Sequence, residues 1–242
     1  MRDAPLRPWL LITACVVAFA ARPAALPSDE PAPRATALQR FLAVPDPRPT
    51  QVRALRHLEA QNEHFEKSAW MDVWTDLDDT GFRYQVIAEG GSEYIRSHVL
   101  RAALDSECQM RTFGGAERAA LTPDNYIFEE GTVQPDGLLS LSVKPRRRDL
   151  LFVEGSLFIS PEDGELVRME GKLSKAPSFW TRRVDIVRWF RRVAGFRMPV
   201  AVDSVANVRI VGRSTFRMTY DYESVNGQRV GSPQPSRLAQ LR

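Results

Sequence analysis

The sequence has few of the residues on which most catalytic and metal sites depend. It contains two cysteines, Cys15 and Cys108, and three histidines, His57, His64 and His98. Neither His57 nor His64 has a neighbouring ligand at metal-binding spacing, and a hydrolase triad has no recognisable base. The sequence also lacks a phosphate-binding glycine loop and a complete nucleophile elbow. It therefore predicts a protein that is not an enzyme and that needs no cofactor or metal.

The chain also lacks a long apolar run. Residues 9–21 are uncharged and largely apolar, but a membrane-spanning helix needs roughly 20 such residues. Arg2 and Arg7 precede this run, and residues 18–20 (Ala-Phe-Ala) provide the small side chains that signal peptidase prefers. This order is typical of a secretory signal. We expect residues 1–20 to be a signal peptide and the mature protein to be periplasmic. Two alternatives are an uncleaved anchor and a lipid anchor through Cys15, because residues 12–15 resemble a lipobox.

Charge of one sign is not in large excess, since the net charge is +3 and removal of the signal brings it closer to balance. A near-balanced charge gives no indication of a nucleic-acid partner. Lysine is scarce, with four residues among 33 basic ones. Arginine instead clusters, most densely at Arg146, Arg147 and Arg148. These three arginines are candidates for transient contact with an anionic membrane surface. The alternative is a solvated edge that discourages sheet pairing.

The order of apolar residues predicts a single domain over residues 35–227. Residues 21–34 are rich in proline and alanine and predict a flexible linker, and residues 228–242 predict a loose tail. A short helix is expected near residues 38–42, and a second helix from an N-cap at Thr50 to about Lys67. Residues 71–77 and 82–89 predict a hairpin around the turn 78–81. Ser92 is expected to cap a helix that reaches about Cys108.

Alternating apolar residues indicate a series of strands after Leu121. Leu139, Leu141 and Val143 would share one face of a strand, as would Met218 and Tyr220. The short connections favour antiparallel neighbours. We therefore expect an α+β fold that is mostly antiparallel β, either a curved meander sheet or an unclosed β-barrel covered by N-terminal and mid-chain helices. The protein is expected to be a monomer.

Two apparent motifs have simpler interpretations. Residues 76–81 imitate the start of a calcium loop, but the twelfth position, which needs a bidentate glutamate, is Ile87. A hairpin turn explains these residues. Cys108 would end an apolar helix face, and nothing near it in the sequence would lower the pKa of its thiol. A buried structural thiol is therefore expected.

Several short blocks resemble sequences of uncharacterised bacterial exported proteins. They occur at residues 82–86, 89–92, 95–96, 99–100, 154–155, 170–171, 177–180, 198–199 and 220–222. More distantly, the order of an N-terminal helix, a meander and a G-x-L-x-R-x-E-G-type hairpin resembles the LolA/LolB-like class. That class consists of periplasmic lipoprotein carriers with an unclosed barrel and a helical lid. The resemblance implies an apolar cavity, but it transfers no binding residue by position.

These observations favour a carrier module that holds an acyl chain or a lipoprotein in an apolar concavity. Gly155, Gly171 and Ala206 are small residues that would leave space within the sheet. Six residues are candidates for the cavity wall: Trp74, Leu157, Met169, Trp180, Ala206 and Met218. The alternative is a non-catalytic interaction or envelope-sensor domain in which the same face is a filled core.

Overall fold

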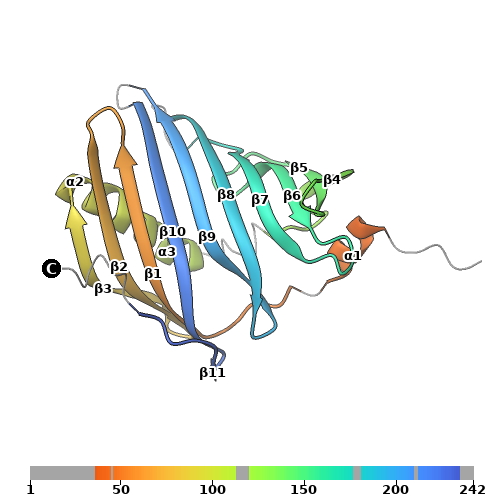
Figure 1. Ribbon diagram of the computed structural model, residues 1–242, viewed down its shortest axis with the longest axis horizontal. Coiled ribbons are helices and arrows are strands. Elements are labelled where there is room, and N and C mark those ends of the chain that lie inside the picture. The colour runs from red at the N-terminus through yellow and green to blue at the C-terminus, as the bar shows by residue number, and fades with distance from the viewer. Residues whose placement is uncertain (1–35, 45, 113–119, 177–180, 210–211, 235–242) are drawn as a thin grey trace, which may run out of the picture. The chain divides into compact units, whose positions relative to one another are not determined.

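The computed structural model describes residues 36–44, 46–112, 120–176, 181–209 and 212–234 (Figure 1). These residues belong to one compact unit. The expected signal peptide, the linker and Trp180 lie outside the described residues, as does the end of the tail. No helix in the described part of the chain is long and apolar enough to cross a membrane.

One sheet of eleven described strands dominates the fold. The strands are β1 (Val52–Asn62), β2 (Lys67–Asp78), β3 (Gly81–Gly91), β4 (Tyr126–Val133), β5 (Leu139–Pro145), β6 (Val153–Ile159), β7 (Leu166–Leu173), β8 (Thr181–Val193), β9 (Phe196–Val208), β10 (Gly212–Val225) and β11 (Gln228–Arg229). Their order is β3-β2-β1-β10-β9-β8-β7-β6-β5-β4, with β11 paired to β10. The pairs are antiparallel. The predicted fold class is thus confirmed as an open, curved sheet.

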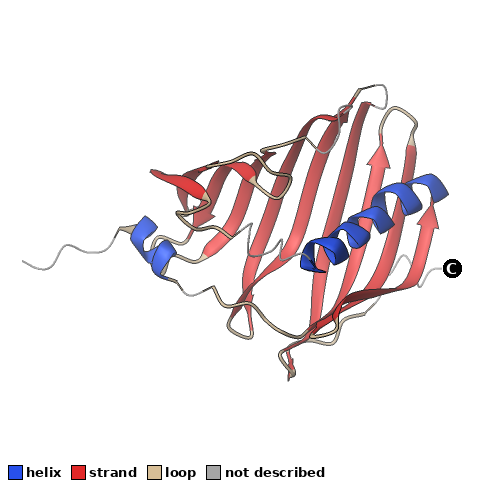
Figure 2. Cartoon of the chain, turned by 180° about the vertical axis from the view of Figure 1, so that it is seen from behind, coloured by secondary structure: helices blue, strands red, loops and turns tan. Residues whose placement is uncertain are grey.

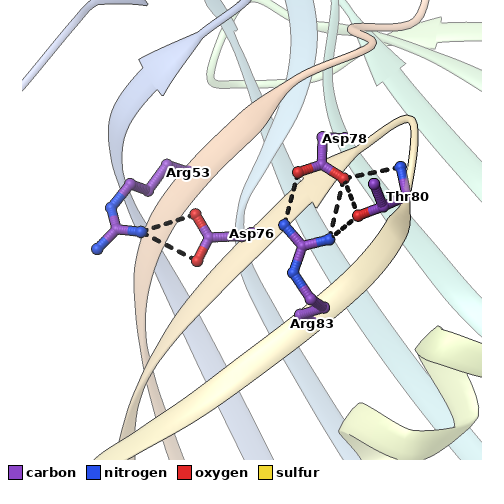
Figure 3. Close-up of polar contacts among 5 residues, drawn as sticks. All are labelled: Arg53, Asp76, Asp78, Thr80 and Arg83. Atoms are coloured by element: carbon purple, nitrogen blue, oxygen red, sulfur yellow. Dashed lines mark hydrogen bonds and ion pairs between the residues drawn. The ribbon is translucent and has the colours of Figure 1, made fainter.

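The helix expected over residues 50–67 is wrong, because this segment is strand β1. Val52, Leu55 and Leu58 recur at helical spacing, and the residues between them are good helix formers. In the sheet, however, β1 lies between β2 and β10, and every second residue from Ala54 to Asn62 is buried, whereas Glu59 and Gln61 on the other face are exposed. Its polar side chains find partners on neighbouring elements; Arg53, for example, pairs with Asp76 at 2.8 Å (Figure 3). Tertiary pairing therefore overrides the local helical pattern.

The helices lie on one face of the sheet, as Figure 2 shows. Helix α1 (Ala37–Ala43) begins with a capping box between Thr36 and Gln39. The second helical region runs continuously through α2 (Glu93–Ile95), a π-helical segment (Arg96–Arg101) and α3 (Ala102–Thr112). Ser92 is its N-cap as expected, although the Ser92 side chain makes no capping hydrogen bond. We call the side that carries α1 and α3 the helix-covered face, and the opposite side the open face.

Two glycines hold strands β6 and β7 close together. Gly155 pairs with Gly171 in the register of these strands. A Cβ atom on Gly155 would lie 2.1 Å from the carbonyl oxygen of Glu170, and one on Gly171 would lie 2.3 Å from that of Glu154. These glycines therefore permit close approach of two backbones. The expectation that they leave space for a ligand is wrong.

In the turn between β2 and β3, the Asp78 carboxylate is hydrogen-bonded to neighbouring residues of the same hairpin, as Figure 3 shows. Asp78 Oδ1 accepts hydrogen bonds from the backbone N–H and the hydroxyl of Thr80, at 2.9 and 2.6 Å. The Arg83 guanidinium donates to both oxygens of the same carboxylate. These bonds, those from Arg83 above all, lower the pKa of Asp78. The hairpin-turn interpretation is confirmed.

At the other end of the chain, the tail expected to be loose begins with an ordered strand. Residues of β11 pair with Ser224 and Val225 of β10. The N–H of Val230 then donates to the carbonyl oxygen of Glu223 at 2.9 Å. The sheet therefore extends a few residues beyond the domain boundary expected from the sequence.

Candidate functional site

Two of the three hydrophobic cores in the described part of the chain pack against the helices, and the third, around Tyr222, lies at one end of the same face. In the first, Ala37 and Phe41 of α1 pack with buried side chains of β4–β9, including Leu141 and Leu157. In the second, Leu100 and Leu104 pack on strands β1–β3 and on β10. The two cores meet where Val202 of β9, which belongs to the first, pairs with Met218 of β10, which belongs to the second.

A strip of half-buried side chains continues from this meeting point along β8, β9 and β10. We call it the seam, and it consists of Val184, Ser204, Ala206 and Phe216. The register places all four on the helix-covered face, because Ala206 pairs with Val184 while Ser204 pairs with Phe216. Figure 2 shows the middle strands between α1 and α3, without a described helix drawn over them. The seam is thus a half-buried part of this face over which no described helix is drawn.

The structure places four of the six residues expected to line a cavity on the helix-covered face, in different parts of it. Leu157 and Met169 are buried in the first core, Met218 is buried in the second, and Ala206 lies in the seam. Trp74 lies on the opposite, open face. There its ring lies 4.6 Å from the guanidinium carbon of Arg53.

A buried ion pair joins the second core to the helix above it. Nη1 of Arg56 lies 2.5 Å from a carboxylate oxygen of Glu107, and the Arg56 side chain is 6% exposed. The guanidinium also lies over the rings of Tyr220 and Phe82, at 4.7 and 5.1 Å. Burial is the largest single influence and lowers the pKa of Arg56. The electrostatic attraction of Glu107, Tyr220 and Tyr222 outweighs the effect of burial, so the pKa of Arg56 is raised. Arg56 therefore remains a cation within the second core.

The open face carries a hydrogen-bonded histidine and a shallow hollow. Nδ1 of His57 lies 2.6 Å from Oδ1 of Asp72, whose side chain is 1% exposed. The hydrogen bond to Asp72 raises the pKa of His57, and Trp70 stacks against its ring. Beside them is a hollow of about 410 Å³, lined among others by Trp70, Asp203 and Arg217. Its lining also includes Ser204 and Phe216, whose side chains lie on the helix-covered face.

Sequence reasoning missed both of these polar pairs. It placed Arg56 and His57 on the exposed side of a helix, where neither needs a partner. Their partners lie 51 and 15 residues away in the chain, so no local pattern connects them. Within the described residues, no group of three histidine, cysteine, aspartate or glutamate side chains could hold a metal ion.

The arginines expected to meet an anionic surface lie together in the loop between β5 and β6. Arg146, Arg147 and Arg148 are all exposed. Nε of Arg146 donates to the carbonyl oxygen of Pro123 at 2.7 Å. The Arg147 guanidinium covers the ring of Phe152 at 4.6 Å. Two of the three side chains are therefore held in place on the protein surface.

Comparison with solved structures finds distant similarity to a protein of known structure. The crystal structure of a LolA superfamily protein from Nitrosomonas europaea is 9% identical in sequence, with a TM-score of 0.36. The match covers 85% of this chain and 97% of the other. No protein-family model matches the chain, and no curated protein matches it. The similarity to that structure is therefore distant.

Proposed function

We propose that the protein is an exported, non-catalytic carrier that holds an acyl chain or another lipid against the seam. The observation that supports this proposal is the separation of the two helix-packed cores on one apolar face. Between them, the seam carries the small side chains of Ser204 and Ala206, both half-buried. An apolar ligand along this strip would remove Val184 and Phe216 from water.

The expected affinity follows from the hydrophobic effect. Each methylene transferred from water into an apolar environment contributes about 0.8 kcal/mol. Contact with roughly eight methylenes would therefore contribute about 6 kcal/mol before ordering costs, which suffices for reversible binding.

A titration with an environment-sensitive fatty-acid probe tests the proposal on delipidated protein. Ala206→Phe would place a large ring in the seam and should abolish saturable binding. Ala201→Phe is a matched control, because Ala201 is also half-buried on β9 but lies on the open face. Circular dichroism would establish that both variants remain folded.

Three results would count against the carrier. They are a wild type without saturable binding, equal losses in the two variants, and a folded Ala206→Phe variant with unchanged affinity. Any of them would favour the alternative of an interaction or envelope-sensor domain with a filled core.

A further inference from the structure

The loops at one end of the sheet share a chemical character that the seam does not explain. The β1–β2, β5–β6, β7–β8 and β9–β10 connections all lie at this end, because successive strands are antiparallel. Hydrogen bonds tie neighbouring loops together. The N–H of Glu63 donates to the carbonyl oxygen of Arg213 at 3.1 Å, and that of Ser174 to Phe152 at 2.8 Å.

This end of the sheet is strongly basic. We define the basic rim as the described residues of these four loops together with the three terminal residues of each strand that they join. It contains eleven basic residues, Lys67, Lys144, Arg146, Arg147, Arg148, Lys172, Lys175, Arg182, Arg183, Arg209 and Arg213. Against them stand four acidic residues, Glu63, Glu66, Asp149 and Glu154. The excess of positive charge is therefore local, since the whole chain carries only +3.

The opposite end has the reverse balance. The same definition, applied to the described β2–β3, β4–β5, β6–β7 and β8–β9 connections, gives seven acidic and five basic residues. Three of these arginines are ion-paired there, Arg83 with Asp78, Arg168 with Asp136 and Arg192 with Glu165. The sheet is thus polarised in charge from one end to the other.

Two large apolar side chains project into solvent on the same basic rim. Phe65, in the β1–β2 loop, is 53% exposed, and Leu150, in the β5–β6 loop, is 45% exposed. Cationic side chains around exposed apolar ones suit a surface that is anionic outside and apolar beneath, which describes a bilayer of acidic lipids. An acidic protein or a nucleic acid would use the charges but would leave Phe65 and Leu150 without an apolar environment.

We propose that the basic rim docks on the surface of an anionic lipid bilayer, with Phe65 and Leu150 entering the headgroup region. The proposal does not depend on lipid binding in the seam, and each can fail while the other holds. Ala206 of the seam is two residues from the end of β9 at the basic rim. If both proposals hold, docking would therefore bring this end of the seam to the membrane.

Flotation of the full chain with lipid vesicles tests the docking. The vesicles contain phosphatidylcholine alone or phosphatidylcholine with phosphatidylglycerol. The test variant is Arg148→Ser with Arg182→Ser, two exposed residues of the rim. The matched control is Arg191→Ser with Arg229→Ser, which removes the same charge from exposed positions at the other end. One basic residue near an anionic surface strengthens binding about fivefold, so the rim variant should lose about 25-fold and the control little.

The expected result has three parts. Wild-type binding requires phosphatidylglycerol, falls steeply with salt, and weakens in the rim variant while the fatty-acid titration is unchanged. Phe65→Ser with Leu150→Ser should weaken binding and keep the salt dependence. Equal losses in the rim variant and its control would overturn the proposal. Binding to phosphatidylcholine alone that matches binding to the anionic vesicles would do the same, because it would assign the attraction to another apolar part of the chain.

Discussion

The pair of Arg56 and Glu107 offers the sharpest test of how the helix is held on the sheet. Glu107→Gln would remove the carboxylate and leave a guanidinium that is 6% exposed. Removing one member of a buried ion pair costs about 3–5 kcal/mol, because the remaining charge has lost its water without compensation. Glu107 itself is 20% exposed, so part of its field is already screened. We therefore expect a loss near the lower end, about 3 kcal/mol.

A double substitution separates the loss of the attraction between Arg56 and Glu107 from the cost of leaving the Arg56 charge buried without a partner. Arg56→Met with Glu107→Gln replaces the guanidinium between Phe82 and Tyr220 by an apolar chain. The double variant should recover most of the loss, because no buried charge remains.

The assay is urea unfolding followed by circular dichroism, with the free energy of unfolding extrapolated to water. The control is the exposed pair of Arg213 and Glu63, whose side chains are 51% and 47% exposed. Glu63→Gln should cost less than about 1 kcal/mol, as is usual for exposed pairs. Equal losses for Glu107→Gln and Glu63→Gln would refute the reasoning. A double variant less stable than Glu107→Gln alone would also refute it.

Three further predictions concern other parts of the fold. His57 should titrate above its ordinary pKa of about 6.5, because of its hydrogen bond to Asp72. Its contribution to stability should be complete below that ordinary value and should disappear as the pH rises through the raised one. NMR titration and unfolding at several pH values measure this, and His57→Gln should flatten the dependence. Cys108 is half-buried, with Sγ 3.5 Å from the carbonyl oxygen of Phe82, so a thiol reagent should label it slowly in native protein and rapidly in urea. Fast native labelling would contradict this. Gly155→Ala should prevent stable folding, because its Cβ would meet the β7 backbone; a thermal midpoint like that of the wild type would show that the strands can separate.

The strands after Leu121 were predictable because each carries its own signal. Leu139, Leu141 and Val143 alternate with polar residues, and all three are buried in the first core. Turn residues mark the hairpins in the same local way. Asn226 and Gly227, with φ of +48° and +79°, form the turn after β10. Local alternation and turn chemistry together therefore predicted most of the sheet.

Strand β1 was not predictable in this way, because one of its two partner strands, β10, is about 150 residues away in the chain. Val52 pairs with Leu77 on one side and with Val225 on the other. Only when β10 returns beside β1 does this helix-forming segment gain two strand neighbours. The same return places Tyr220 against the Arg56 guanidinium, whereas the polar partners of Arg56 and His57 come from α3 and β2.

For the candidate sites, the sequence alone determined that the chain has apolar residues for a ligand-binding face and a cluster of arginines for an anionic surface. Only the tertiary structure decided which of them act together. Trp74 and Met218 both looked like cavity residues, but strand register places them on opposite faces. Arg148 and Arg182 are far apart in the chain, but antiparallel pairing brings their loops to one end of the sheet. The physical reason is that alternation shows only which residues of one strand share a face. Pairing between strands decides which faces of different strands coincide and which of their ends lie together.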